Sequence, residues 1–237
     1  GGAAGGAAGG AAGGAAGGAV ACAQLLCEDF ESADAGWTQL NGWGQGTVGL
    51  TTESAHTGTQ SLKSTSANAG APRWRKSLAS LGAARGTHWG RVWYRVKTPA
   101  PKAMSASAYF HITFVGLRGA LMGQESRVVD TVQSPTGTIQ YLYNLPDDSC
   151  CSGSPYSWRY DGNWHCAEWY VNNATDAYRF FIDGTEVTQI AFTGRTQARL
   201  QDFDEVVLGA IYYVPSNGTL ETYLDDLAIG TSQIGCQ

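Results

Sequence analysis

Segments in which apolar and polar residues alternate recur along most of the chain. In the stretch 89–97, Trp, Arg and Lys at odd positions alternate with Gly, Val and Tyr at even ones, and 105–115 alternates in the same way. A period of two residues predicts β-strands that bury one face, and no stretch has the 3.6-residue period of a long helix. Strands are therefore predicted at 20–32, 37–40, 46–50, 89–97, 105–115, 127–132, 138–143, 164–171, 178–182, 203–214 and 223–230, with one more entered through the turn 56–63.

Turn residues separate these strands. Asn41-Gly42 is a strong turn signal, and Ser134-Pro135-Thr136-Gly137 predicts a hairpin between the strands on either side. Many short strands with Gly, Asn and Asp turns are typical of an all-β fold, a two-sheet antiparallel β-sandwich. The length of 21–237 fits one such domain, so we predict a single β-jelly-roll domain there.

The first twenty residues differ from the rest in composition. Residues 1–18 are a strict Gly-Gly-Ala-Ala repeat, which has nothing to bury and predicts a flexible linker over 1–20. The alternative is that the repeat is an expression artefact. Such tracts resemble the spacers that follow the lipid-anchored Cys of bacterial surface lipoproteins, which implies a location at the cell surface.

Charge and hydropathy narrow the range of partners. The net charge is −5 and the pI is near 5.3, which argues against nucleic acid as the main partner. No apolar run approaches the roughly 20 residues that a membrane span needs. We expect a monomer without a membrane span.

Six cysteines in a polar, strand-rich chain predict an oxidising compartment and three disulfides. None of their spacings matches a zinc site. The favoured pairing joins Cys27 to Cys236 and one of Cys150 or Cys151 to Cys166, which leaves Cys22 for the remaining partner, although the sequence does not determine this connectivity.

The closing strand 223–230 contains an unusual carboxylate. Strict alternation places Asp225 on the same face as Tyr223, Leu227 and Ile229, which predicts that it points toward the core. A carboxylate in such a position is costly unless a cation or a hydrogen-bond network compensates it.

Several motifs resemble known families. The segments 27–31 and 56–62, together with Gly36-Trp37, resemble the opening of jelly-roll carbohydrate-binding modules, and 223–227 resembles their closing strand. The middle of the chain resembles the concanavalin-A-like sandwiches related to fungal cellulose-induced proteins and glucuronan lyases. The residues that carry this second resemblance are 91–95, 164–169, 178–184 and 234–236.

The resemblance implies a structural calcium ion that joins the first strand, a turn and the closing strand. Mapped onto this chain, its ligands are Glu31, Thr57, Gln60 and Asp225. Two carboxylates with hydroxyl and amide oxygens suit a hard cation. The alternative is that Asp225 caps backbone N–H groups without a metal.

The resemblance also implies a polysaccharide groove. Trp89 and Trp93 offer faces for sugars, while Arg91 and Arg95 on the same strand face suit a carboxylate. We expect 89–97 and 105–115 to lie side by side as the floor of this groove. The alternatives are Trp side chains packed under a loop and Arg side chains on a solvated face.

Related lyases cleave uronate-containing glycans by β-elimination, which requires a base, a group that neutralises the uronate carboxylate, and an acid. The expected base is His111, and Arg91 or Arg95 neutralises the carboxylate with help from Gln140. Tyr109 or Tyr143 is the expected acid. A structural role for His111 is the alternative.

The functional hypothesis is an extracellular or bacterial cell-surface polysaccharide lyase. A non-catalytic carbohydrate-binding jelly-roll protein is the alternative from another class, and a purely structural surface domain is the third.

Overall fold

The computed structural model describes residues 22–32, 36–40, 42–119, 125–144, 152–194 and 200–237. The predicted linker, Cys150 and Cys151 lie outside these residues. None of the helices in the described part of the chain is long and apolar enough to cross a membrane.

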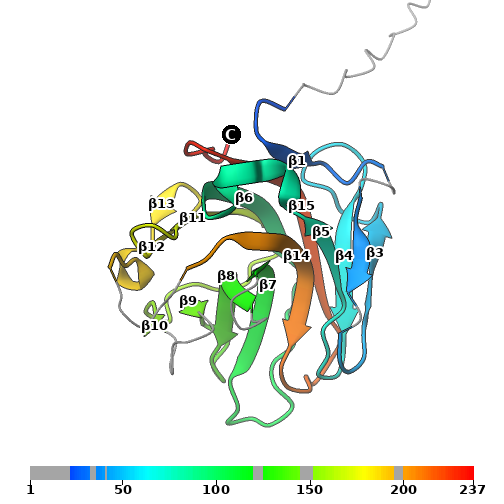
Figure 1. Cartoon of the computed structure of the whole chain (residues 1–237). Coiled ribbons are helices and arrows are strands. Elements are labelled where there is room, and N and C mark those ends of the chain that lie inside the picture. The colour runs from blue at the N-terminus through cyan, green and yellow to red at the C-terminus, as the bar shows by residue number, and fades with distance from the viewer. Residues whose placement is uncertain (1–21, 33–35, 41, 120–124, 145–151, 195–199) are drawn as a thin grey trace, which may run out of the picture.

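Two antiparallel sheets form the molecule (Figure 1). The first, which we call the β6 sheet, contains in spatial order β13 (Thr185–Glu186), β12 (Ala177–Ile182), β11 (Trp164–Asn172), β6 (Thr87–Val96), β15 (Leu220–Gly230), β4 (Ser61–Ser66) and β3 (Thr47–Thr51), and β1 (Leu26–Glu28) also pairs with β15. The second, the β7 sheet, contains β10 (Ser152–Gly153), β9 (Ile139–Asn144), β8 (Glu125–Gln133), β7 (Phe110–Gly119), β14 (Phe203–Tyr212), β5 (Arg73–Ser77) and β2 (Thr38–Leu40). Two short 3-10 helices are present among the described residues: Ala79–Arg85 lies between β5 and β6, and Thr188–Ile190 lies between β13 and β14.

The core lies between the two sheets. The even-numbered residues of β6, Val92, Tyr94 and Val96, are buried there with Phe110, Ile112 and Phe114 of β7. The rings of Tyr94 and Phe114 stack across the interface with their centroids 5.0 Å apart. The predicted all-β antiparallel sandwich is therefore confirmed, and so are the predicted inward faces of β6 and β7.

The expectation that 89–97 and 105–115 are neighbours is wrong. β6 and β7 belong to different sheets, and residues 97–109 carry the chain from one to the other. Alternation determines which side chains face the core, but it does not determine which sheet a strand joins. The polar faces of β6 and β7 consequently lie on opposite outer surfaces of the sandwich.

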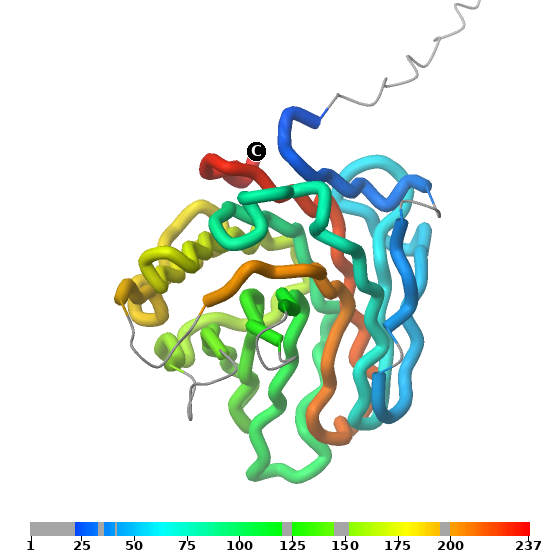
Figure 2. The backbone as a smooth tube through the Cα atoms, viewed as in Figure 1, coloured from blue at the N-terminus to red at the C-terminus, as the bar shows by residue number. Residues whose placement is uncertain are grey.

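The closing strand β15 pairs with β1. Leu26 lies opposite Ile229, and Glu28 lies opposite Leu227. The described N-terminal segment and the C-terminal tail therefore lie at the same end of the molecule, at the top of Figures 1 and 2.

The favoured disulfide pairing is wrong. Cys22 bonds to Cys27, and Cys166 bonds to Cys236. After β15 the tail crosses β6 toward β11, where the carboxylate of Glu168 accepts hydrogen bonds from the amides of Ile234 and Gly235 at 2.8 and 2.9 Å. Cys236 is therefore carried to Cys166 of β11 and away from β1, which pairs with the other edge of β15.

Asp225 does not point toward the core. The pairing of β15 with β6 shifts register between Asp225 and Ala228, and Asp226 adopts a φ of 47°. This bulge interrupts the alternation, so Asp225 lies opposite Trp93 on the outer face while Leu227 and Ile229 belong to the core. The side chain is nevertheless fully buried, because the loop that contains His56 and Thr57 covers it.

Two smaller features of the β7 sheet differ in how well the sequence predicted them. The hairpin of β8 and β9 is confirmed. Strand β5 was not predicted, because Arg73, Arg75 and Lys76 obscure any apolar alternation. This strand matters because it adds Arg73 and Arg75 to one edge of β14.

Candidate functional site

The outer face of the β7 sheet gathers polar side chains from several strands. His111 of β7 lies opposite Val132 of β8, which lies opposite Gln140 of β9. Directly paired residues share a face, so His111 and Gln140 lie on the same surface. The next outward position along β7 is Thr113, which pairs with Asp130 of β8.

His111 is held by a buried carboxylate. Its Nε2 lies 2.8 Å from each carboxylate oxygen of Asp130, whose side chain is fully buried, and 23% of the His111 side chain is exposed. A carboxylate can only accept, so Nε2 carries the proton and donates it. In this tautomer Nδ1 has a free lone pair, which can take a proton from a ligand.

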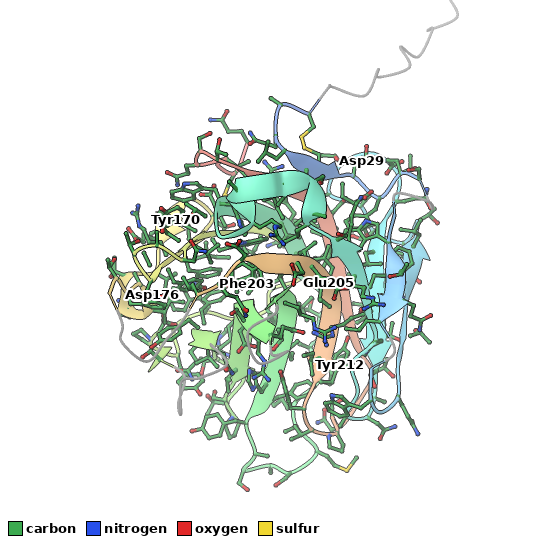
Figure 3. All side chains as sticks on the ribbon, viewed as in Figure 1. Asp29, Tyr170, Asp176, Phe203, Glu205 and Tyr212 are labelled. Atoms are coloured by element: carbon green, nitrogen blue, oxygen red, sulfur yellow. A yellow bond between two sulfur atoms is a disulfide. The ribbon has the colours of Figure 1, made fainter. Side chains whose placement is uncertain are left out.

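Tyr213, which directly follows β14, completes this hydrogen-bond network. Its ring stacks on His111 with centroids 4.3 Å apart, and its hydroxyl lies 3.1 Å from the Thr113 hydroxyl. Thr113 donates its own proton to Asp130 at 2.7 Å, so Tyr213 must donate to Thr113. Figure 3 labels the preceding residue, Tyr212, toward the lower end of β14.

The Tyr213 hydroxyl keeps its proton near neutral pH. Burial raises the pKa of Tyr213 to about 12, with Arg127 opposing this effect and Asp130 adding to it. A protonated phenol beside a histidine with a free lone pair provides an acid and a base on one surface.

Arginine side chains lie beside this network. The guanidinium carbon of Arg127 is 5.1 Å from the centroid of the Tyr213 ring, and Nε of Arg127 is buried without a hydrogen-bond partner in the described residues. Farther along the face, Arg73 forms an ion pair with Glu125 at 2.6 Å. Gly116 makes room for Glu125, because a Cβ there would lie 2.1 Å from the carboxylate.

Four of the predicted site residues lie on the other sheet. Trp89, Arg91, Trp93 and Arg95 all occupy the outer face of the β6 sheet, so the structure does not bring them together with His111. Arg91 donates to the backbone carbonyl of Gly235 at 3.2 Å, and Arg95 donates to that of Gly162 at 2.6 Å.

The two tryptophans of this strand are in contact with other side chains of the β6 sheet. Trp93 stacks on His56 with centroids 3.8 Å apart. Trp89 contacts the rings of Phe181 and of Tyr170, which Figure 3 labels. The guanidinium carbon of Arg179 lies 5.9 Å from the centroid of the Trp89 ring.

The two tyrosines predicted as candidates for the catalytic acid lie in different environments. Tyr143 is buried in the core, where its ring contacts Phe192 at 4.9 Å. Tyr109 is 53% exposed two residues before His111, and its ring centroid lies 5.8 Å from that of Tyr156.

The four predicted calcium ligands lie together at one loop, residues 56–60. Thr57 and Gln60 belong to this loop, and Glu31 and Asp225 accept hydrogen bonds from its backbone amides. The Asp225 carboxylate accepts hydrogen bonds from the amides of His56 and Thr57, at 2.7 and 3.4 Å. Glu31 accepts from the amides of Thr59 and Gln60, both at 2.8 Å. Burial raises the pKa of Asp225 to about 7, and the adjacent Asp226 adds to this effect.

The four predicted calcium ligands do not form a cluster of acidic and histidine side chains. Among the described residues, no group of three or more His, Cys, Asp or Glu side chains is arranged to hold a metal ion.

Asp130, Arg127 and Tyr213 were not among the site residues predicted from the sequence. Asp130 carried a usable signal, because it is a carboxylate inside a predicted strand and directly follows two apolar residues, Val128 and Val129. Register shifts between β7 and β8 hide the alternation that would have placed it beside His111. Tyr213 carried no local signal, since its role comes from the pairing of β14 with β7.

Comparisons with known proteins define the fold. The structure is similar to that of a cellulose induced protein, Cip1, with a TM-score of 0.65 and 16% identity over 90% of this chain and 100% of that one. It is also similar to an endo-β-1,4-glucuronan lyase from the fungus Trichoderma reesei, with a TM-score of 0.59 and 16% identity over 88% and 96% of the two chains. A carbohydrate esterase from bacteriophage phi24B matches with a TM-score of 0.52 and 15% identity over 87% and 97%.

No protein-family model and no curated protein matches the sequence. The two sheets and the structural matches show that the chain is a jelly-roll β-sandwich, as the motifs predicted. Within that class, its fold is the one found in the cellulose induced protein and in glucuronan lyase. At these identities the likeness applies to the fold alone.

Proposed function

We propose that the protein is an extracellular polysaccharide lyase that cleaves uronate-containing glycans by β-elimination. The observation that carries the proposal is the network on the outer face of the β7 sheet, where His111, Asp130, Thr113 and Tyr213 are joined by contacts of 2.7 to 4.3 Å. This network supplies a base and an acid at one place. The fold is also one in which a glucuronan lyase is known.

The proposed roles follow from the protonation of each group. Nδ1 of His111 removes the proton on the carbon next to the uronate carboxylate, and that electron pair forms the new C=C bond. The C–O bond to the leaving sugar breaks, and Tyr213 protonates the leaving oxygen. Asp130 is a positioning residue, because it holds the His111 ring and the tautomer that this step needs.

Arg127 takes the role that the sequence analysis assigned to Arg91 or Arg95. A uronate carboxylate must be neutralised before the neighbouring proton becomes acidic enough to remove. Arg127 lies beside Tyr213, and its buried Nε has no hydrogen-bond partner in the described residues. Gln140, on the same face, is proposed to donate a second hydrogen bond to that carboxylate.

The test follows the absorbance of the unsaturated product formed from polyglucuronate or alginate. His111→Ala and Asp130→Asn are expected to lower kcat by at least about a hundredfold. Arg127→Ala is expected to lower kcat/KM by a similar factor. Arg179→Ala, on the outer face of the β6 sheet, is the matched control and should keep full activity.

Two outcomes would contradict this assignment. Wild-type protein that produces no unsaturated product from either polymer would exclude the lyase. Loss of activity in Arg95→Ala with full activity in Arg127→Ala would place the site on the other sheet.

A non-catalytic carbohydrate-binding protein remains the second candidate. The exposure of Tyr109 beside Tyr156 favours it, because exposed aromatic rings stack on sugars whether or not chemistry follows. Retention of polysaccharide without any unsaturated product would support this function.

We also propose a structural calcium ion held by Glu31, Thr57, Gln60 and Asp225. The donors fit a hard cation, since they are carboxylate, hydroxyl, amide and backbone oxygens around one loop. Asp225 in particular is a fully buried carboxylate whose described hydrogen bonds come from backbone amides. The ion would compensate this charge and take no part in the elimination.

The two disulfides support an extracellular location, because disulfides persist in oxidising compartments. Lipid anchoring at a bacterial surface and a monomeric state remain predictions.

A further inference from the structure

Trp43 is a large apolar side chain that the fold leaves exposed. It lies between β2 and β3, and 50% of its surface is accessible to solvent. Its indole lies beside Tyr213, with ring centroids 6.5 Å apart. It is therefore next to the ring that stacks on the candidate base, His111.

The backbone around Trp43 is fixed by close packing. The Trp43 carbonyl accepts a hydrogen bond from Ala71 N at 2.9 Å, and Gly44 pairs with Gly70, which pairs in turn with Tyr212. A Cβ on Gly70 would lie 1.9 Å from the carbonyl oxygen of Gln45, so only glycine allows this approach. The indole is thus presented by backbone that is tied to the end of β14.

Trp43 extends a row of side chains that crosses the strands. Tyr213 donates its backbone N–H to the carbonyl of His111, and His111 lies opposite Val132, which lies opposite Gln140. Each step across a sheet is about 4.8 Å, which is comparable to the size of one sugar ring. A polysaccharide that follows the row passes over the base and the acid and then reaches the indole.

The contrast with Trp89 shows why Trp43 suits a ligand. Trp89 already contacts Tyr170 and Phe181, and Arg179 lies against the same group of rings. The described contact of the Trp43 ring is the tilted one with Tyr213. A flat apolar ring on rigid backbone, exposed beside a polar site, is the type of surface on which a sugar ring stacks.

We propose that Trp43 is a stacking platform for the sugar unit next to the one held at His111 and Tyr213, so that the polysaccharide crosses the strands of the β7 sheet. The inference rests on the proposed function, in that it takes a polysaccharide as the ligand of this face. It adds the orientation of the polysaccharide relative to the strands and a sugar-binding subsite on the β14 side of the sheet.

The test measures binding, which does not require turnover. Affinity electrophoresis or calorimetry with polyglucuronate, alginate and a neutral β-1,4-glucan compares wild type with Trp43→Ala and Trp43→Phe. Trp43→Ala is expected to weaken binding about fivefold to tenfold, and Trp43→Phe less, because the phenyl ring keeps part of the stacking surface. Leu25→Ala, which removes a similarly exposed apolar side chain next to β1, should bind like wild type.

The outcomes separate this inference from the proposed function. Binding that weakens in Trp43→Ala while the wild type forms no unsaturated product would support the subsite and exclude the lyase. Wild-type affinity in Trp43→Ala, or a loss found in Trp89→Ala instead, would overturn the subsite even in an active lyase. A wild type that binds none of the three polymers would overturn both. Equal melting temperatures would show that the variants are folded.

Discussion

At the scale of single residues, His88 is a fully buried histidine whose environment favours the neutral ring. The Nδ1 of His88 donates to the carbonyl of Ala84 at 3.0 Å, and its Nε2 accepts from the Trp169 indole at 3.5 Å. The bond from Trp169 requires the neutral ring, because Nε2 can accept only while it is unprotonated. Burial lowers the pKa of His88 to about 4.

His88 should therefore make stability fall in acid. The unfolded chain binds a proton on this residue near pH 6.5, while the folded protein resists it until about pH 4. Its contribution is complete above pH 6.5 and is lost as the pH falls toward 4, by about 3 kcal/mol of unfolding free energy. Denaturant unfolding of wild type and His88→Gln between pH 4 and 8 measures this loss.

The comparison cancels the titration of the carboxylates, which both proteins share. His165 acts in the opposite direction: burial would lower its pKa, but hydrogen bonds to Asp183 and Asp161 outweigh this and raise it. It is also present in both proteins. Identical pH slopes for the two proteins would contradict the role given to His88.

At the scale of elements, the C-terminal tail acts as a strap over the β6 sheet. The buried carboxylate of Glu168 accepts hydrogen bonds from the amides of Ile234 and Gly235 and from the Gln233 side chain at 2.8 to 2.9 Å. Arg91, for which the family resemblance implied a role in substrate binding, donates to tail carbonyls instead. The Cys166–Cys236 disulfide closes the strap.

The two disulfides should differ in how much they stabilise the fold. The Cys166–Cys236 bond spans 70 residues, and the Cys22–Cys27 bond spans 5. In the chain-entropy model the longer loop is worth about 4 kcal/mol and the shorter about 2 kcal/mol. Chemical denaturation of the Cys166→Ala/Cys236→Ala and Cys22→Ala/Cys27→Ala double variants should show the larger loss in the first.

Equal stability of the two double variants would mean that the length of the closed loop does not determine how much each disulfide stabilises the fold. A larger loss in the Cys22 and Cys27 pair would contradict the order outright.

At the scale of the whole molecule, the chain ends and the candidate site are separated. β1, the loop 56–60 and β15 meet in the β6 sheet, whereas His111 and Tyr213 lie on the outer face of the β7 sheet. The proposed calcium ion would join Glu31, just after β1, to Asp225 in β15. Its removal should therefore loosen the fold without altering the groups that do the chemistry.

Calcium removal is expected to lower the melting temperature by about 5 to 10 °C relative to protein at a calcium concentration a hundred times its Kd. Calorimetric scans with EDTA, and then with calcium in excess, would measure the shift and its reversal. Asp225→Asn should abolish the calcium-dependent part, and magnesium serves as the control cation. A fully depleted protein with an unchanged melting temperature would exclude the ion.

The sequence alone determined most of the strands, the inward faces of β6 and β7, and the class of fold. Alternation marks a half-buried strand without any knowledge of its neighbours, so 89–97 and the hairpin of β8 and β9 were predictable. His111 and Gln140 were also predictable as polar residues on outward positions. These features depend on interactions between residues close in the chain and on burial, which composition and period report directly.

Only the tertiary structure shows which strands share a sheet, and this arrangement determines which side chains can form one site. Arg91 and His111 both point outward, but from opposite surfaces, so the proposed site has Arg127 in place of Arg91 or Arg95, and Tyr213 in place of Tyr109 or Tyr143. The bulge at Asp226 reversed the face of Asp225, and the path of the tail selected Cys166 for Cys236. Strand pairing, bulges and disulfide choice depend on contacts between distant segments, which local periodicity does not encode.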